Sequence, residues 1–226
     1  MPNAPTQHFE LSISLMPTLS SRLLVVTDRH QTNGRPLVPL LQRVLAATTP
    51  IVQLRERDLS ARELVRLARE VQAVTASSHR SQLLINDRID VALALEGVGV
   101  HLRSNSLPVS VARQLLGAQR LLGVSVHSVE EAMQVESQGA DYIVLGPIYA
   151  TPSKQMFGPP LGIHTLEKAC RLVRIPIIGI GGVTAAHARE MRRAGAFGVA
   201  VITAILGAAD VESATRELLD AVTCVP

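Results

Sequence analysis

Aromatic residues are scarce in this chain of 226 residues, where Phe and Tyr together make up 2% and Trp does not occur. Proteins that bind single-stranded nucleic acid stack bases on aromatic rings, so this scarcity argues against a nucleic-acid partner. It also means that Val, Ile, Leu and Ala, which fill parallel sheets covered on both faces, must form the core. Because 47% of the residues are hydrophobic, that core can be large.

Cysteines and long apolar runs are equally scarce. The two cysteines, Cys170 and Cys224, lack metal-ligand spacing and are expected to be small buried apolar residues. No apolar run is long enough to cross a bilayer, and the first residues lack the basic start and apolar run of a secretory signal. We therefore expect a cytoplasmic protein with no membrane partner.

Short β-branched segments alternate with amphipathic segments of helical length from residue 23 onwards. The expected strands are Leu23–Asp28, Ile51–Arg55, Leu83–Asp87, Val98–Leu102, Leu121–Val126, Tyr142–Ile148, Ile177–Gly182 and Val199–Ala204. The expected helices are Leu37–Ala47, Ala61–Thr75, Ile89–Leu95, Val109–Leu116, Val129–Gln138, Leu166–Val173, Ala185–Ala194 and Glu212–Val222. Eight strand–helix pairs without a break in composition predict a single (β/α)8 TIM barrel over residues 21–226, after an N-terminal tail of residues 1–20.

An open, doubly wound sheet is the alternative architecture. It usually carries a glycine fingerprint directly after its first strand. Here the first strand ends in Thr27-Asp28-Arg29-His30 instead, which favours the closed barrel.

Nearly every expected strand finishes in polar residues or glycine, and in a TIM barrel these ends form the catalytic rim. Gly181-Gly182 after the seventh strand and Ile202-Thr203 after the eighth offer backbone N–H groups at the usual phosphate position. These four residues are therefore predicted to bind a phosphate.

The loop after the sixth strand carries a second anion signal. It combines two hydroxyls, Thr151 and Ser153, with the ammonium group of Lys154. A mobile loop of this kind can close over a phosphate or pyrophosphate.

Taken together, the strand-end segments resemble the thiamine phosphate synthase superfamily, which includes a thiazole tautomerase branch (TenI). The likeness runs from Leu23 to Val222. It is carried by Gln-Leu-Arg-Glu-Arg at 53–57, Ile-Asn-Asp-Arg at 85–88, Gly-Val-His-Leu at 99–102, Gly-Val-Ser-Val-His at 123–127, Ala-Asp-Tyr at 140–142, Gly-Pro-Ile-Tyr-Ala-Thr-Pro-Ser-Lys at 146–154, Ile-Gly-Gly-Val-Thr at 180–184 and Gly-Val-Ala-Val-Ile at 198–202.

A synthase of this superfamily joins a pyrimidine pyrophosphate to a thiazole phosphate. Pyrophosphate departs first, and the thiazole nitrogen captures the pyrimidine-stabilised cation. The resemblance implies that the pyrimidine and pyrophosphate are held by Gln53, Arg55, Asn86 and Lys154, while Asp87 matches one of two Mg-binding aspartates. Thr151 and Ser153 match a Thr pair on the loop, and Gly182, Ile202 and Thr203 match the thiazole-phosphate cradle. Arg57, Arg103 and Ser125 complete the expected substrate-binding set.

The chain departs from the synthase pattern after the fourth strand. Synthases usually read His-Leu-Gly-Gln-x-Asp-Leu-Pro, and this chain reads His-Leu-Arg-Ser-Asn-Ser-Leu-Pro at 101–108. Ser106 therefore replaces the second Mg-binding aspartate, and Arg57 stands where synthases often have Lys. These changes resemble the tautomerase branch. We therefore expect a thiazole tautomerase without a metal, which aromatises a thiazole carboxylate phosphate by a proton shift and uses His127 as the acid/base group.

Two alternative functions remain open. A synthase that uses Mg is possible if Arg103 partly replaces the metal's charge and Asn105 supplies an oxygen ligand. A non-catalytic thiazole-phosphate binder or regulator would keep the phosphate anchors without needing His127. His101 is a second acid/base candidate, and the resemblance also suggests a homodimer.

Overall fold

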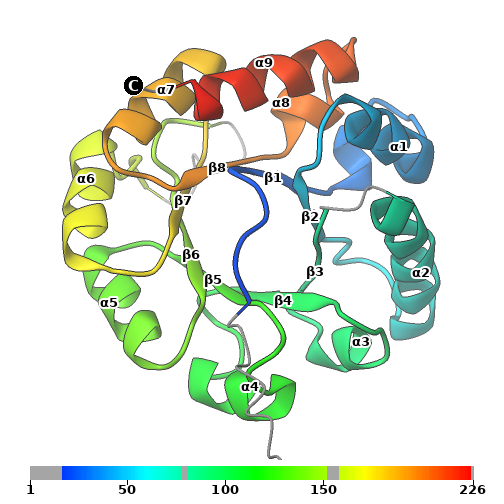
Figure 1. Ribbon diagram of the computed structural model, residues 1–226, viewed down its shortest axis with the longest axis horizontal. Coiled ribbons are helices and arrows are strands. Elements are labelled where there is room, and N and C mark those ends of the chain that lie inside the picture. Colours follow the sequence, from blue (N-terminus) through cyan, green and yellow to red (C-terminus); the bar gives the residue numbers. More distant parts are fainter. Residues whose placement is uncertain (1–16, 78–80, 152–157, 225–226) are drawn as a thin grey trace, which may run out of the picture.

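The computed structural model describes residues 17–77, 81–151 and 158–224, and in these ranges eight parallel strands close into a barrel (Figure 1). Each strand pairs with the next one in the sequence, and β8 pairs back with β1. The predicted (β/α)8 barrel is therefore confirmed. The strands are β1 (Leu23–Val26), β2 (Ile51–Leu54), β3 (Leu83–Asn86), β4 (Gly99–Leu102), β5 (Leu122–Val126), β6 (Tyr142–Leu145), β7 (Ile177–Ile180) and β8 (Gly198–Val201).

Helices surround the barrel as an outer ring (Figure 1). They are α1 (Leu37–Ala47), α2 (Ala61–Ser77), α3 (Ile89–Leu93), α4 (Val109–Leu116), α5 (Val129–Ser137), α6 (Ile163–Leu172), α7 (Ala185–Arg193), α8 (Thr203–Leu206) and α9 (Val211–Thr223). Two short elements were not predicted. A 3-10 helix, η1 (Arg29–Gln31), follows β1, and α8 begins where the last strand was expected to continue.

Side-chain oxygens fix several helix starts. Ser128 accepts a hydrogen bond from the backbone N–H of Glu131, and Thr184 accepts one from the backbone N–H of His187. Asp210 does the same at α9. Each bond satisfies an N–H group that has no partner within the helix, so these residues set where the helices begin.

Alternating strand residues divide the apolar core into two parts. One set, which includes Leu23, Val25 and Val52, packs between the sheet and the helices. The other set, which includes Leu24 and Ile51, points into the barrel and forms a second cluster there. This alternation follows from the two-residue period of a strand. It also directs the polar residues near the strand ends into the barrel mouth.

The end of the barrel at which the strands begin, which we call the lower end, is covered by the segment before β1. This segment crosses the ring of strands in Figure 1 (dark blue). Leu19 packs against the interior cluster. Gln82, just before β3, accepts a hydrogen bond from Ser20 N at 2.9 Å and donates one to Thr18 O at 2.8 Å. The predicted tail otherwise lies mostly outside the described residues, and the domain division stays a prediction.

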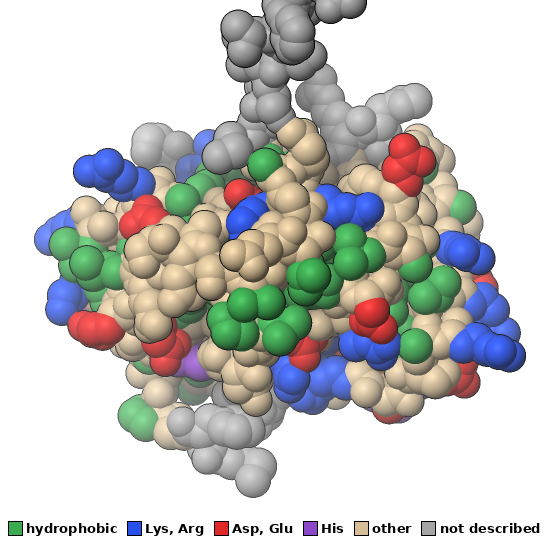
Figure 2. Space-filling model, turned by 90° about the horizontal axis from the view of Figure 1, so that it is seen from below, with side chains coloured by type: hydrophobic (Ala, Val, Ile, Leu, Met, Phe, Trp, Pro, Cys, Tyr) green, Lys and Arg blue, Asp and Glu red, His purple; other side chains and the backbone are tan. Residues whose placement is uncertain are grey.

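The outer surface carries a few exposed apolar side chains. Figure 2 views the molecule from the side on which α4 lies, and hydrophobic side chains gather on this face. Leu107, Val111 and Leu115, spaced four residues apart, are 51%, 39% and 52% exposed. The homodimer stays a prediction.

Cys224 is also exposed, so the expectation that it is buried was wrong, because it follows the last turn of α9. Within the described ranges, no helix is both long and apolar enough to span a membrane.

Candidate active site

Two amides form a polar pair inside the mouth of the barrel. Gln53 on β2 and Asn86 on β3 both point inward, and Gln53 Nε2 donates a hydrogen bond to Asn86 Oδ1 at 3.0 Å. Only 3% of Gln53 and 8% of Asn86 are exposed. Because an amide offers both donors and acceptors, this pair suits the polar edge of a heteroaromatic ring. The structure thus brings together two residues that were predicted to hold the pyrimidine.

Three arginines gather above this pair, at the ends of β2 and β4. We call Arg55, Arg57 and Arg103 the arginine cluster. Burial lowers the pKa of Arg55, and the positive charges of Arg57 and Arg103 lower it further, while Asp28 and Glu56 act in the opposite direction. Arg55 lies 3.6 Å from Asp28 Oδ2. Among the described residues, Arg57 has no ion-pair partner. The cluster therefore favours an incoming anion.

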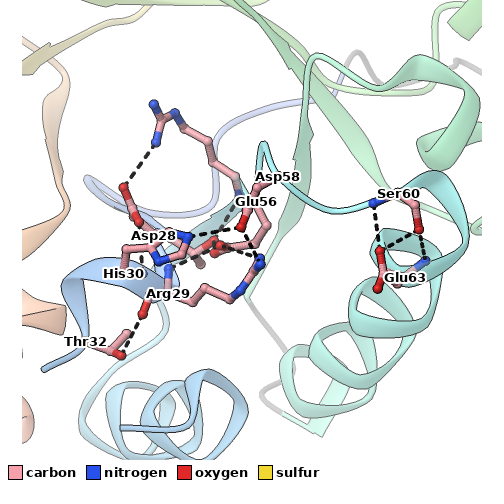
Figure 3. A network of polar contacts seen from close by, with 10 residues as sticks. Asp28, Arg29, His30, Thr32, Glu56, Asp58, Ser60 and Glu63 are labelled. Atoms are coloured by element: carbon pink, nitrogen blue, oxygen red, sulfur yellow. Dashed lines mark hydrogen bonds and ion pairs between the residues drawn. The ribbon is translucent and has the colours of Figure 1, made fainter. Parts of the chain in front are cut away.

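A buried carboxylate organises this part of the rim (Figure 3). The Glu56 side chain is 1% exposed. It accepts hydrogen bonds from Thr27 Oγ1 at 2.6 Å and from the Arg29 backbone N–H at 3.1 Å. Thr27 Oγ1 in turn accepts a hydrogen bond from the backbone N–H of Arg55 at 2.9 Å. Glu56 therefore fixes the turns that follow β1 and β2.

Glu56 and Thr27 were missed as site residues by the sequence reasoning. The available signal was the single acidic residue between Arg55 and Arg57 at the end of a strand. A carboxylate flanked by two arginines, directly after a buried strand, is a candidate for holding them in place.

Asp87, the predicted metal ligand, is fully engaged by neighbouring side chains. Its Oδ2 accepts a hydrogen bond from Arg103 Nε at 2.8 Å and forms an ion pair with Arg103 Nη2 at 2.6 Å. Its Oδ1 accepts a hydrogen bond from the Ser106 hydroxyl. Within the described residues, no three His, Cys, Asp or Glu side chains are grouped so that they could hold a metal ion. The donors present at Asp87 therefore do not fit a two-carboxylate magnesium site.

His101 belongs to a chain of polar side chains inside the barrel. Its Nδ1 lies 2.8 Å from Tyr142 Oη, and its Nε2 lies 2.8 Å from Ser125 Oγ. Gly123 leaves the space that the Tyr142 ring fills, since a Cβ atom there would lie 2.0 Å from Tyr142 Cζ. Burial lowers the pKa of His101 to about 3. The ring therefore stays neutral at physiological pH and has no spare nitrogen for acid/base work.

The predicted phosphate residues lie on the opposite part of the rim. β7 and β8 are paired up to Ile180 and Ala200, so the residues that follow them leave the sheet side by side. We call Gly181, Gly182, Ile202 and Thr203 the phosphate loops. Gly181 has φ +103° and Gly182 has φ +61°, conformations that favour glycine.

The loop after β6 packs closely onto Gly182. A Cβ atom on Gly182 would lie 2.5 Å from Ala150 O. His187 on α7 donates a hydrogen bond from Nδ1 to Gly182 O at 2.6 Å, and its ring stacks on Tyr149 with the centroids 3.8 Å apart. Tyr149 Oη donates a hydrogen bond to Glu190 at 2.6 Å. The sequence did not reveal this support, because Tyr149 and His187 meet only when β6 and β7 lie side by side.

Other predicted residues have more varied places. His127 is exposed after β5, and its Nδ1 donates a hydrogen bond to Gly146 O at 2.6 Å. Thr151 lies within the loop after β6 and is partly buried. Ser153 and Lys154 lie outside the described residues.

The order of the strands places the two anion regions across the barrel mouth from each other. The arginine cluster and Asp87 follow β2 to β4, and the phosphate loops follow β7 and β8 (Figure 1). The Gln53–Asn86 pair lies inside the mouth. Two anionic groups can therefore bind at opposite sides of one mouth.

Comparison with known proteins agrees with this arrangement. The family model for thiamine monophosphate synthase matches residues 23–205. A thiamine-phosphate synthase of Moorella thermoacetica is 44% identical over 201 residues, which cover 89% of this chain and 95% of the relative. A putative thiamine-phosphate synthase of Geobacter sulfurreducens is 44% identical over 204 residues, covering 90% of this chain and 95% of the relative.

A solved structure gives the same result. The thiamine phosphate pyrophosphorylase from Pyrococcus furiosus superposes with a TM-score of 0.81 at 33% identity, and the match covers 90% of this chain and 96% of that structure.

The expected tautomerase activity was wrong. Relatives that are 44% identical over nearly their whole length are named as synthases, so the changes after β4 do not mark a tautomerase. The acid/base role expected of His127 depended on that activity and loses its basis. The chain is an enzyme of thiamine biosynthesis, and it belongs to the thiamine monophosphate synthase family.

Proposed function

We propose that this chain is a thiamine-phosphate synthase that acts on two small phosphorylated substrates. The bond between the pyrimidine methylene carbon and the pyrophosphate oxygen breaks, and the electron pair leaves with the pyrophosphate. The thiazole nitrogen then gives its lone pair to the carbon and forms the new C–N bond. The products are thiamine phosphate and pyrophosphate.

The observation that carries this proposal is the presence of two anion regions on one rim. A synthase must hold a pyrophosphate and a phosphate at once, with the two rings between them. The arginine cluster follows β2 and β4, and the phosphate loops follow β7 and β8 on the opposite side. Holding both reactants in one geometry removes much of the entropic cost of a reaction between two molecules.

The proposed contacts fall into three groups, one for each substrate and one on the loop after β6. Gln53 and Asn86 bind the pyrimidine, and the arginine cluster binds the pyrophosphate as it gains negative charge. Gly181, Gly182, Ile202 and Thr203 bind the thiazole phosphate. Lys154, Ser153 and Thr151 are proposed to cover the reacting groups from the loop after β6.

Ser125, the remaining residue that was predicted to bind substrate, also has a proposed role. His101 Nε2 lies 2.8 Å from Ser125 Oγ inside the barrel, and this contact is proposed to hold the Ser125 hydroxyl in one position. The magnesium that the resemblance implies for a synthase has no two-carboxylate seat at Asp87, and none of these roles depends on it.

The test is an assay of the purified protein with pyrimidine pyrophosphate, thiazole phosphate and Mg, in which thiamine phosphate and released pyrophosphate are both measured. Equal amounts of the two products are expected. Arg55→Ala should raise KM for the pyrimidine substrate, whereas Arg69→Ala, an exposed arginine on α2, should leave KM unchanged. An absence of product, beside a synthase control that is active, would refute the proposal.

A further inference from the structure

The side chain of Arg103 lies on the carboxylate where a synthase of this family would be expected to hold magnesium. Arg103 Nε donates a hydrogen bond to Asp87 Oδ2 at 2.8 Å, and Arg103 Nη2 forms an ion pair with the same oxygen at 2.6 Å. Ser106 supports the arrangement from the other side, since its hydroxyl donates to Asp87 Oδ1 and accepts a hydrogen bond from the Arg103 backbone N–H at 2.9 Å. Arg103 is therefore held at both its backbone and its side chain.

A cation cannot join this arrangement without breaking it. Magnesium binds carboxylate oxygens at about 2.1 Å and demands a near-octahedral set of oxygen ligands. At Asp87 Oδ2 it would meet the guanidinium group, which carries charge of the same sign. At Oδ1 it would have to displace the proton donated by Ser106, and Ser106 offers only a neutral hydroxyl in place of a carboxylate.

The guanidinium group is able to bind an anion while it stays on Asp87. Arginine has five N–H donors in a planar fork, and the contacts with Asp87 engage Nε and Nη2. Among the described residues, the two N–H donors of Nη1 have no partner. The side chain is 42% exposed, compared with 22% for Asp87, so part of the guanidinium group is accessible to an incoming anion. Arg55 and Arg57 contribute charge of the same sign nearby.

We propose that Arg103, held in place by Asp87 and Ser106, takes the position of a carboxylate-bound magnesium ion and binds the pyrophosphate group of the pyrimidine substrate directly. The inference rests on the proposed function for the identity of that substrate. The binding proposed for Arg103 requires only a pyrophosphate anion. Asp87 is then a positioning residue for Arg103 and not a metal ligand.

The first test is a calorimetric titration with inorganic pyrophosphate, carried out once with a chelator and once with excess Mg. The wild-type protein should bind pyrophosphate in the presence of the chelator, and Arg103→Ala should weaken that binding roughly tenfold to a hundredfold, the range for a charge-assisted hydrogen bond. Arg103→Lys should retain part of the affinity, because it keeps the charge but loses the planar fork.

Arg88→Ala is the matched control, because Arg88 follows Asp87 in the chain and pairs with Asp90 at 2.5 Å at a similar exposure of 37%. Its pyrophosphate affinity should equal that of the wild type. Circular dichroism and thermal unfolding of each variant test whether the barrel is intact. Equal affinities for Arg103→Ala and Arg88→Ala, or wild-type binding that appears only with Mg, would overturn the inference.

The second test rebuilds the family pattern with the double variant Arg103→Gly/Ser106→Asp. This variant should bind pyrophosphate and form thiamine phosphate only with Mg, while the wild type keeps turnover in the chelator. Wild-type turnover that is lost with the chelator to the same extent as in the double variant would contradict the inference. If the wild type forms no thiamine phosphate under any condition, the proposed function fails, and the pyrophosphate titration still decides the role of Arg103.

Discussion

Replacing Glu56 by Gln should destabilise the fold far more than the same change at Glu63, although both carboxylates lie in one region of the molecule (Figure 3). The Glu56 side chain is 1% exposed and accepts from Thr27 Oγ1 at 2.6 Å, from Arg29 N at 3.1 Å and from Arg29 Nη1 at 3.4 Å. A Gln has one side-chain oxygen, so it can accept hydrogen bonds only from the donors on that side. Its NH2 group would face the donor or donors on the other side and could not accept from them. Losing one charge-assisted bond and leaving a buried donor unpaired gives about 3 kcal/mol.

For a chain of this length, about 3 kcal/mol corresponds to a fall in Tm of roughly 6–12 °C. Glu63 accepts from Ser60 N at 2.9 Å and Ser60 Oγ at 2.6 Å at the exposed start of α2. Glu63→Gln should change Tm little, because Gln also completes such a capping box. Thermal unfolding followed by circular dichroism measures both variants. Similar Tm values for the two would refute the assignment of Glu56 as the residue that organises this rim.

Three further outcomes are expected. Gly182→Ala should raise KM for the thiazole phosphate at least tenfold, because the added Cβ would lie 2.5 Å from a backbone oxygen. Gly34→Ala is the control and should leave KM unchanged, because Gly34 has a similar φ of +74° and nothing within 4 Å of the added Cβ. Equal KM values for the two variants would contradict the steric argument. His187→Asn should also raise that KM, and His164→Asn, on the exposed face of α6, serves as its control in the same steady-state assay. The pKa of His101 is lowered to about 3 in the fold from an unfolded value near 6.5, so the unfolded state binds more protons between these values and stability is lost as pH falls through this window. As the pH is lowered, Tm should therefore decrease less steeply for His101→Asn than for the wild type. Parallel plots of Tm against pH would refute the lowered pKa of His101.

The barrel could be predicted from the sequence because its local signals repeat. Each strand is a short β-branched run, each is followed by polar residues or glycine, and each helix has an apolar stripe. The end of the last strand was misplaced because Ile202-Thr203-Ala204-Ile205 also reads as a β-branched run. Tertiary contacts select a helical turn there instead, and Arg35 Nη2 donates to Leu206 O at 2.7 Å to hold it.

The site was predicted in outline but not in its internal contacts. Strand order alone brings Gln53 beside Asn86 and Gly182 beside Ile202. The contacts of Glu56 and of Asp87 depend on side chains from other strands, and a sequence does not show which of several nearby charges will pair. The tautomerase expectation failed for another reason. The loss of a metal ligand at Ser106 was read as a change of reaction, although relatives that share the synthase name are similar over nearly the whole chain. In the structure, Arg103 and Ser106 both contact the carboxylate of Asp87.

The segment that crosses the lower end of the barrel has a practical consequence for handling the protein. Because residues 17–22 run beneath the strands and Leu19 packs against the interior cluster there, a fusion partner or surface linkage joined directly to this segment would be attached at the end opposite the rim. Immobilisation through that end would leave the rim facing the solution. A deletion that removed Leu19 would instead open a hydrated path into the base of the barrel, where Tyr142 lies.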